Sequence, residues 1–116
     1  MGNALTAIFL ACGQDVACVS EASVGLTRMD VVGDGSFYAS ISLPNLIVGT
    51  VGGGTDLPTT SEALAMMGCK GEGSARKFAE ICAATALAGE ISLGAAMATG
   101  QFAKAHAEFG RTPKRH

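Results

Sequence analysis

The sequence predicts an α+β fold: a long central buried helix, flanking short helices and a small antiparallel sheet. Three observations support it. Residues 74–99 form an apolar run that has no proline and is rich in alanine, the best helix former. Residues 37–43 alternate apolar and polar side chains, the pattern of a half-buried strand. Shorter helix-like segments lie before and after these two stretches, and 116 residues suit one modest domain.

Composition narrows the classes of function. The chain is 48% hydrophobic and 16% charged, so it can build a core. Its formal charge of -2 gives no reason to expect nucleic acid or an anionic membrane as a partner. The cysteines lack zinc-ligand spacing, and we expect no metal. No secretory signal is recognisable before them, so we expect reduced thiols and a cytoplasmic protein. The four cysteines are Cys12, Cys18, Cys69 and Cys82.

The first elements are two short helices. Asn3–Cys12 has apolar residues spaced for a helix that faces a core, and Gly13 interrupts it. A second helical piece is expected over Asp15–Ala22. Asp15 is a candidate N-cap of that piece, because aspartate accepts hydrogen bonds from the free backbone N–H groups of a first turn.

A β-hairpin is expected next. Val24–Val32 and Phe37–Leu43 are the two strand-like runs, and Gly33–Gly35 between them has the residues of a tight turn. A third strand is expected over Leu46–Val51.

The third strand leads into a glycine-rich loop, Gly49–Thr55, with the sequence GTVGGGT. One interpretation is a flexible turn. The other is a loop whose backbone lies directly against a ligand, often a phosphate or a cofactor. The loop is neither a P-loop nor a G-x-G-x-x-G fingerprint. Its residues alone favour neither interpretation.

The later elements are helical. A short helix is expected to start at Thr59–Glu62, just after Pro58, and to continue through Ala63–Met67 until Gly68 stops it. Ser74 is the expected N-cap of the long helix. Gln101–Phe109 forms a further short helix that carries His106. A single histidine there is compatible with a structural residue.

The long helix is apolar nearly all round, which is typical of a helix that neighbours cover on most sides. It contains Glu80 and Glu90. Each carboxylate would cost several kcal/mol, about 2.5–3.5 on an insertion scale, at the centre of a bilayer. We therefore expect a buried core helix and no membrane segment in this chain.

Four segments together resemble a known family. They are NALTAIFLACGQD (Asn3–Asp15), GTVGGGTDLP (Gly49–Pro58), LAGEISLGAAMATG (Leu87–Gly100) and FAKAH (Phe102–His106). In this order they resemble 3-hydroxy-3-methylglutaryl-coenzyme A (HMG-CoA) reductase of class I, for which GTVGGGT is typical. The resemblance covers almost the whole chain. It implies that residues 1–116 correspond to the C-terminal portion of the large catalytic domain, without the N-terminal portion and the small cofactor domain.

The resemblance implies roles for individual residues. Asp15 would be the catalytic aspartate that hydrogen-bonds a lysine, and His106 the acid that protonates the leaving coenzyme A thiolate. Asn3 would help to hold the acyl group of the substrate. The other implied substrate-binding residues are Leu93, Ala96 and Met97. The implied cofactor-binding residues are Gly52, Gly53, Gly54, Thr55 and Arg111.

The implied activity is a two-step reduction of HMG-CoA to mevalonate and coenzyme A by NADPH, with NADH as the alternative. The family's catalytic glutamate and lysine have no match in this sequence, so we expect the chain alone to be inactive. The family also implies a homodimer or a higher homo-oligomer. A second hypothesis is a non-catalytic, truncated module for folding or dimerisation.

Overall fold

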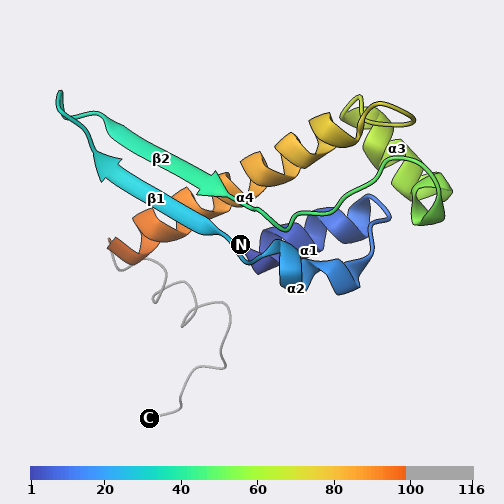
Figure 1. The fold of residues 1–116 in the computed structure, drawn as a ribbon, viewed down its shortest axis with the longest axis horizontal. Helices are drawn as coiled ribbons and strands as arrows, with labels where there is room; N and C mark the ends of the chain where they lie inside the picture. Colours follow the sequence, from blue (N-terminus) through green and yellow to red (C-terminus); the bar gives the residue numbers. More distant parts are fainter. Residues whose placement is uncertain (99–116) are drawn as a thin grey trace, which may run out of the picture.

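The computed structural model describes residues 1–98 and confirms the α+β class. Figure 1 shows the long helix α4 running through the structure, with the hairpin beside its C-terminal half. The helices α1 and α3 lie nearer its N-terminal half. In chain order the elements are α1 (Gly2–Ala11), η1 (Val16–Cys18), α2 (Val19–Ala22), β1 (Leu26–Val31), β2 (Phe37–Ser42), η2 (Gly53–Asp56), α3 (Pro58–Met66) and α4 (Ala75–Ala98).

The short helices predicted within residues 1–98 are confirmed, with shifted boundaries. The segment after Asp15 divides into the 3-10 turn η1 and the single turn α2. Helix α3 spans Pro58–Met66, close to the start expected at Thr59–Glu62 and the end expected at Met67. A proline at the first helical position loses no hydrogen bond, because that N–H has no partner within the helix. The helix predicted over Gln101–Phe109 lies outside the described residues.

The predicted hairpin is confirmed as a two-stranded antiparallel sheet. Its register runs from Leu26 opposite Ser42 to Val31 opposite Phe37. The turn is closed by the backbone N–H of Val32, which donates to the carbonyl oxygen of Ser36 at 2.8 Å.

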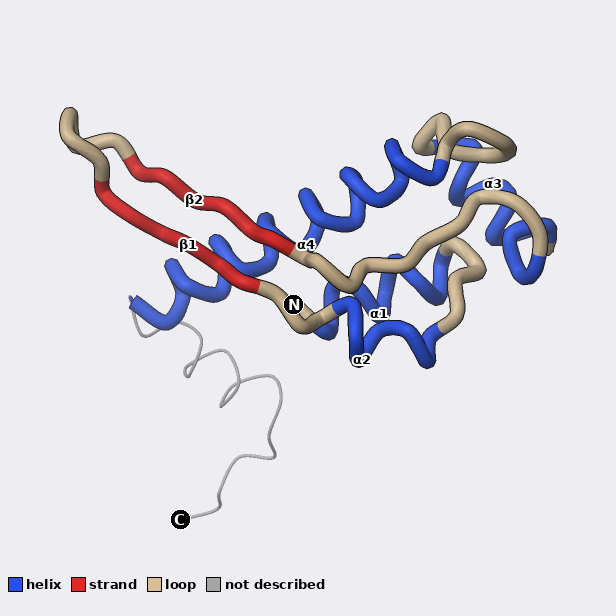
Figure 2. The backbone as a smooth tube through the Cα atoms, in the orientation of Figure 1, coloured by secondary structure: helices blue, strands red, loops and turns tan. Residues whose placement is uncertain are grey.

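The third strand predicted over Leu46–Val51 is wrong. Residues 43–52 run as a loop past the end of α1 (Figure 2). The turn at Pro44 takes the chain away from the hairpin. The backbone of Gly49 then pairs with the side chain of Gln14, and the backbone of Thr50 with that of Gly71. These backbone groups therefore have partners other than a neighbouring strand.

The core is built where α1, α3 and α4 meet. Among residues 1–98, its nine buried apolar residues are Leu5, Phe9, Cys12, Ala22, Leu64, Cys69, Phe78, Cys82 and Ala86. On α4 only Phe78, Cys82 and Ala86 are buried, on one face of the helix. The buried face of α4 is thus narrower than expected, because α1 and β2 pack against one side of the helix.

Helix α4 is also long and apolar enough to cross a membrane, judged by length and composition alone. Core helices of soluble proteins pass the same test, so the feature is weak evidence of a membrane span.

The turn η2 packs against the segment that follows α1 through two glycines, Gly54 and Gly13. A Cβ atom on Gly13 would lie 2.4 Å from the carbonyl oxygen of Gly54. A Cβ atom on Gly54 would lie 2.9 Å from the carbonyl oxygen of Gly13. Gly13 also has a φ of 69°, which favours glycine. The two backbones are therefore in direct contact, with no room for a side chain between them.

Three of the four free cysteines are in the core. Cys12, Cys69 and Cys82 are 0–1% exposed, whereas Cys18 is half-buried. Burial raises the pKa of Cys82 to about 12, with a smaller contribution in the same direction from the neighbouring thiols of Cys12 and Cys69. A buried, protonated thiol is a poor nucleophile, because the thiolate is the reactive form.

This burial predicts the order of thiol labelling. In the folded chain at pH 8, an aromatic disulfide reagent should label Cys18 first. Cys12, Cys69 and Cys82 should react only as the chain unfolds. Raising the pH to 9 should not change this for Cys82, because its pKa lies about three units higher. Mass spectrometry of the labelled peptides measures the order. Cys18→Ser should remove the fast phase, and rapid labelling of all four thiols would contradict the described core.

The glycine contact predicts a large effect of a single methyl group. Gly13→Ala should lower the free energy of unfolding by at least about 1–3 kcal/mol, because the new Cβ meets backbone and the φ is strained. Gly33→Ala is the matched control. A Cβ there meets nothing within 4 Å, so the change should stay within about 0.5 kcal/mol. Urea unfolding followed by circular dichroism measures both. Equal midpoints for the two variants would show that Gly13 and Gly54 are not in contact.

Candidate functional site

An open cavity of about 450 Å³ lies where the segment after α1 meets the glycine-rich loop. Two separate parts of the sequence form its wall. The lining residues are Gly13, Gln14, Asp15, Gly49, Val51, Gly52, Gly53, Gly54 and Thr55. The structure thus brings the candidate residue Asp15 together with the candidates Gly52, Gly53, Gly54 and Thr55.

Asp15 is exposed; it caps a helical turn and also lines the cavity. Its Oδ1 atom accepts a hydrogen bond from the backbone N–H of Ala17 at 2.9 Å, which confirms the predicted N-cap. Its residue also lines the cavity. The capping interaction occupies one carboxylate oxygen and leaves acceptor capacity for a partner in the cavity. A capping role and a role in the cavity are therefore compatible.

The glycine-rich loop presents bare backbone to the cavity. Gly52 and Gly53 have φ values of 76° and 54°, a conformation that side chains rarely adopt. The hydroxyl of buried Thr55 donates to the carbonyl oxygen of Gly52 at 2.6 Å and closes the turn. The loop is thus an ordered turn that lines a cavity. Without side chains at its tip, a flat or anionic ligand could approach the main chain closely.

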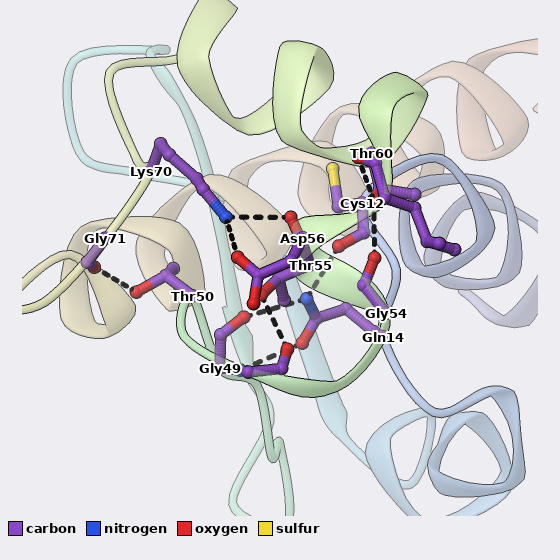
Figure 3. A network of polar contacts seen from close by, with 12 residues as sticks. Cys12, Gln14, Gly49, Thr50, Gly54, Thr55, Asp56, Thr60, Lys70 and Gly71 are labelled. Carbon is purple, nitrogen blue, oxygen red and sulfur yellow. Dashed lines mark hydrogen bonds and ion pairs between the residues drawn. The ribbon is translucent and has the colours of Figure 1, made fainter.

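Gln14 is the residue that holds the beginning of this loop (Figure 3). Its Nε2 atom donates to the carbonyl oxygens of Gly49 at 2.8 Å and Cys12 at 3.0 Å. Its Oε1 atom accepts from the backbone N–H of Gly49 at 2.8 Å. No role was predicted for Gln14, although it lies within the segment Asn3–Asp15 that carries the family resemblance.

Thr60 and Lys70 hold the end of the loop, and no motif or spacing in the sequence predicted a role for either. The hydroxyl of Thr60 donates to the carbonyl oxygen of Gly54. The Nζ atom of Lys70 donates to the carbonyl oxygen of Thr55 at 2.9 Å and pairs with the carboxylate of Asp56 at 2.7 Å (Figure 3). Each side chain acts on backbone or on an exposed carboxylate, so neither contact follows from residue type alone.

The residues that line the cavity determine what the site can do chemically. One carboxylate can accept hydrogen bonds, and a row of glycines admits a ligand to the backbone. Glycines of this kind can border a cofactor. Among residues 1–98, no group of three or more histidine, cysteine, aspartate or glutamate side chains is placed to hold a metal ion.

The remaining candidate residues lie away from this cavity or outside the described residues 1–98. Asn3 is exposed on the first turn of α1, and it does not line the Asp15 cavity. On α4, Leu93 and Ala96 are half-buried and Met97 is 63% exposed. None of these three lines the cavity either. His106 and Arg111 lie outside the described residues.

A second hollow, apolar and about 430 Å³ in volume, lies between the hairpin and the C-terminal half of α4. Its wall includes Met29, Phe37 and Ile91.

Comparison with known proteins shows extensive similarity along the chain. A family described as hydroxymethylglutaryl-coenzyme A reductase matches residues 1–111. The 3-hydroxy-3-methylglutaryl-coenzyme A reductase of Methanocaldococcus jannaschii is 52% identical over 94% of this chain. The protein of the same name from Pyrococcus abyssi is 51% identical over 95% of it. A plant relative, 3-hydroxy-3-methylglutaryl-coenzyme A reductase 1 of Hevea brasiliensis, is 42% identical over 97%.

These alignments cover 27%, 28% and 21% of the three relatives, so the chain spans about a quarter of their length. The similarity nevertheless includes both segments that form the cavity, since the family match runs through Asp15 and the whole glycine-rich loop. The chain therefore belongs to the hydroxymethylglutaryl-coenzyme A reductase family, a family of oxidoreductases.

Proposed function

We propose that this chain forms part of a reductase that converts HMG-CoA to mevalonate and coenzyme A with NADPH, or alternatively NADH. The supporting observation is that Asp15 and the glycine-rich loop share one cavity in a chain of this family. In relatives of several times this length the same segments belong to proteins named as HMG-CoA reductases.

The glycine-rich loop suits a nicotinamide cofactor, because its exposed backbone leaves space for a planar ring at the wall. Such a cofactor would supply hydride when bound. Gly52, Gly53, Gly54 and Thr55 would border it. Asp15 would hold a proton-donating partner by accepting its hydrogen bond beside the reacting carbonyl.

The other roles follow from the family resemblance. His106 would donate a proton to the departing coenzyme A thiolate, and an imidazole with an ordinary pKa near 6.5 suits this step near neutral pH. Asn3 and the apolar side chains of Leu93, Ala96 and Met97 would contact the acyl part of the substrate, and Arg111 would lie near the cofactor.

We further propose that the 116 residues do not turn over substrate alone. The catalytic glutamate and lysine that the resemblance implies have no match here. Without a cationic group to stabilise the developing oxyanion, the barrier rises by several kcal/mol, in the range of about 2.7–4 for one donor. The complete site would form with the missing portion, in a cytoplasmic homodimer or higher homo-oligomer.

A second candidate function is a non-catalytic module for folding or dimerisation. Exposed apolar side chains at the end of the hairpin favour it: Val31 and Phe37 are register partners on β1 and β2 and are 77% and 59% exposed. Apolar surface of this kind is typical of a face that another polypeptide covers.

Complementation separates the two functions. The purified chain should oxidise no NADPH in the presence of HMG-CoA. Mixing it with the M. jannaschii reductase truncated before the matching region should restore NADPH oxidation, followed by absorbance. Asp15→Asn or His106→Ala should reduce the restored rate by about 100-fold or more, the usual scale for acid–base groups.

Asp34→Asn is the matched control for this experiment. Asp34 is an exposed carboxylate in the hairpin turn, so its loss should leave the restored rate unchanged. A stable complex of the two polypeptides without NADPH oxidation would contradict the enzymatic proposal and support the non-catalytic module.

A further inference from the structure

The side chain of Gln14 pairs with the main chain of a residue 35 positions away. Its amide donates to the carbonyl of Gly49 and accepts from the N–H of the same residue, both at 2.8 Å. A third bond, to the carbonyl of Cys12, ties the amide back to the end of α1. A glutamine amide offers two donor hydrogens and one acceptor oxygen. All three groups are used here.

This pairing replaces the strand contact that the sequence predicted for residues 46–51. The polar groups of Gly49 are half-buried and need partners. In this structure the described residue that satisfies both of them is Gln14. The amide thus fixes the two peptide groups on either side of the Gly49 Cα atom, at the entrance of the glycine-rich loop.

Gln14 lies between two residues that contribute to the same site. Gly13 before it contacts the backbone of Gly54, at the far end of the loop. Asp15 after it lines the cavity. Three consecutive residues therefore hold the loop's end (Gly13), hold its beginning (Gln14) and contribute a carboxylate-bearing residue to the same cavity (Asp15).

We propose that Gln14 is a positioning residue that fixes the glycine-rich loop as the cavity wall opposite Asp15. Gln14 also lines the cavity, but its side-chain amide bonds the main chain, and its proposed action is through the loop. The ligand in question is the nicotinamide cofactor, and this part rests on the proposed function. The positioning of the loop stands on the hydrogen bonds alone.

Amide hydrogen exchange on the full 116-residue chain, read by NMR, tests the positioning. Gln14→Met keeps the length of the side chain and removes all three hydrogen bonds. The Gly49 amide loses its acceptor directly. The informative amides are those of Thr55 and Gly71, which bond to the carbonyl oxygens of Gly52 and Thr50 instead. They should exchange about tenfold faster or more, which corresponds to about 1.4 kcal/mol.

Two references make this result specific. The amide of Phe78, at the start of α4, should keep its exchange rate within about twofold, because only the loop is released. Asn45→Leu removes an exposed amide from the turn after β2 and should leave all these rates unchanged. Unchanged rates at Thr55 and Gly71 in Gln14→Met would overturn the proposal. An equal acceleration at Phe78 would also overturn it, since Gln14 would then contribute only to general stability.

Titration with NADPH, followed by the amide shifts of Gly52, Gly53 and Gly54, tests the functional part separately. The unsubstituted chain should bind, and Gln14→Met should bind about tenfold more weakly. If the unsubstituted chain shows no shifts, the cofactor assignment is wrong while the exchange result still decides the role of Gln14. If both chains bind equally despite faster exchange in the variant, a role for Gln14 in ligand binding is refuted.

Discussion

The site depends on one close contact between two backbones, that of Gly13 with Gly54. It joins the end of α1 to the glycine-rich loop across 41 positions of sequence, so Asp15 and residues 49–55 can share a wall. The hydrogen bonds of Gln14, Thr60 and Lys70 then hold the loop on either side of that contact. Because each of these bonds reaches a backbone atom, the shape of the loop is held without bulky side chains inside it.

Sequence reasoning predicted the elements whose signals are local. The first helix, the cap at Asp15 and the hairpin with its turn at Gly33–Gly35 depend on neighbouring residues, and all three are confirmed. The third strand failed because the fate of Leu46–Val51 depends on partners far along the chain. An apolar run with strand propensity becomes a loop when a side-chain amide and a distant glycine satisfy its backbone.

The same distinction applies to the site. Asp15 and the glycine-rich loop were named from motifs, and the structure brings them to one cavity. Gln14, Thr60 and Lys70 were not, because each contacts main-chain oxygens that any residue could offer, and only the fold shows which one lies within reach. The burial of α4 was overestimated for a related reason. Periodicity shows that a helix is apolar on many sides, and the packing decides which sides have neighbours.

The contact between Gly13 and Gly54 also limits the substitutions that these two positions can accept. When two side chains touch, a larger one at one position can be offset by a smaller one at the other, and the two positions then vary together. Gly13 and Gly54 have no smaller residue to change to, and neither substitution can be compensated by its partner. Methods that infer spatial proximity from correlated substitution would therefore find no signal for this contact. The closest approach in the site would be invisible to covariation.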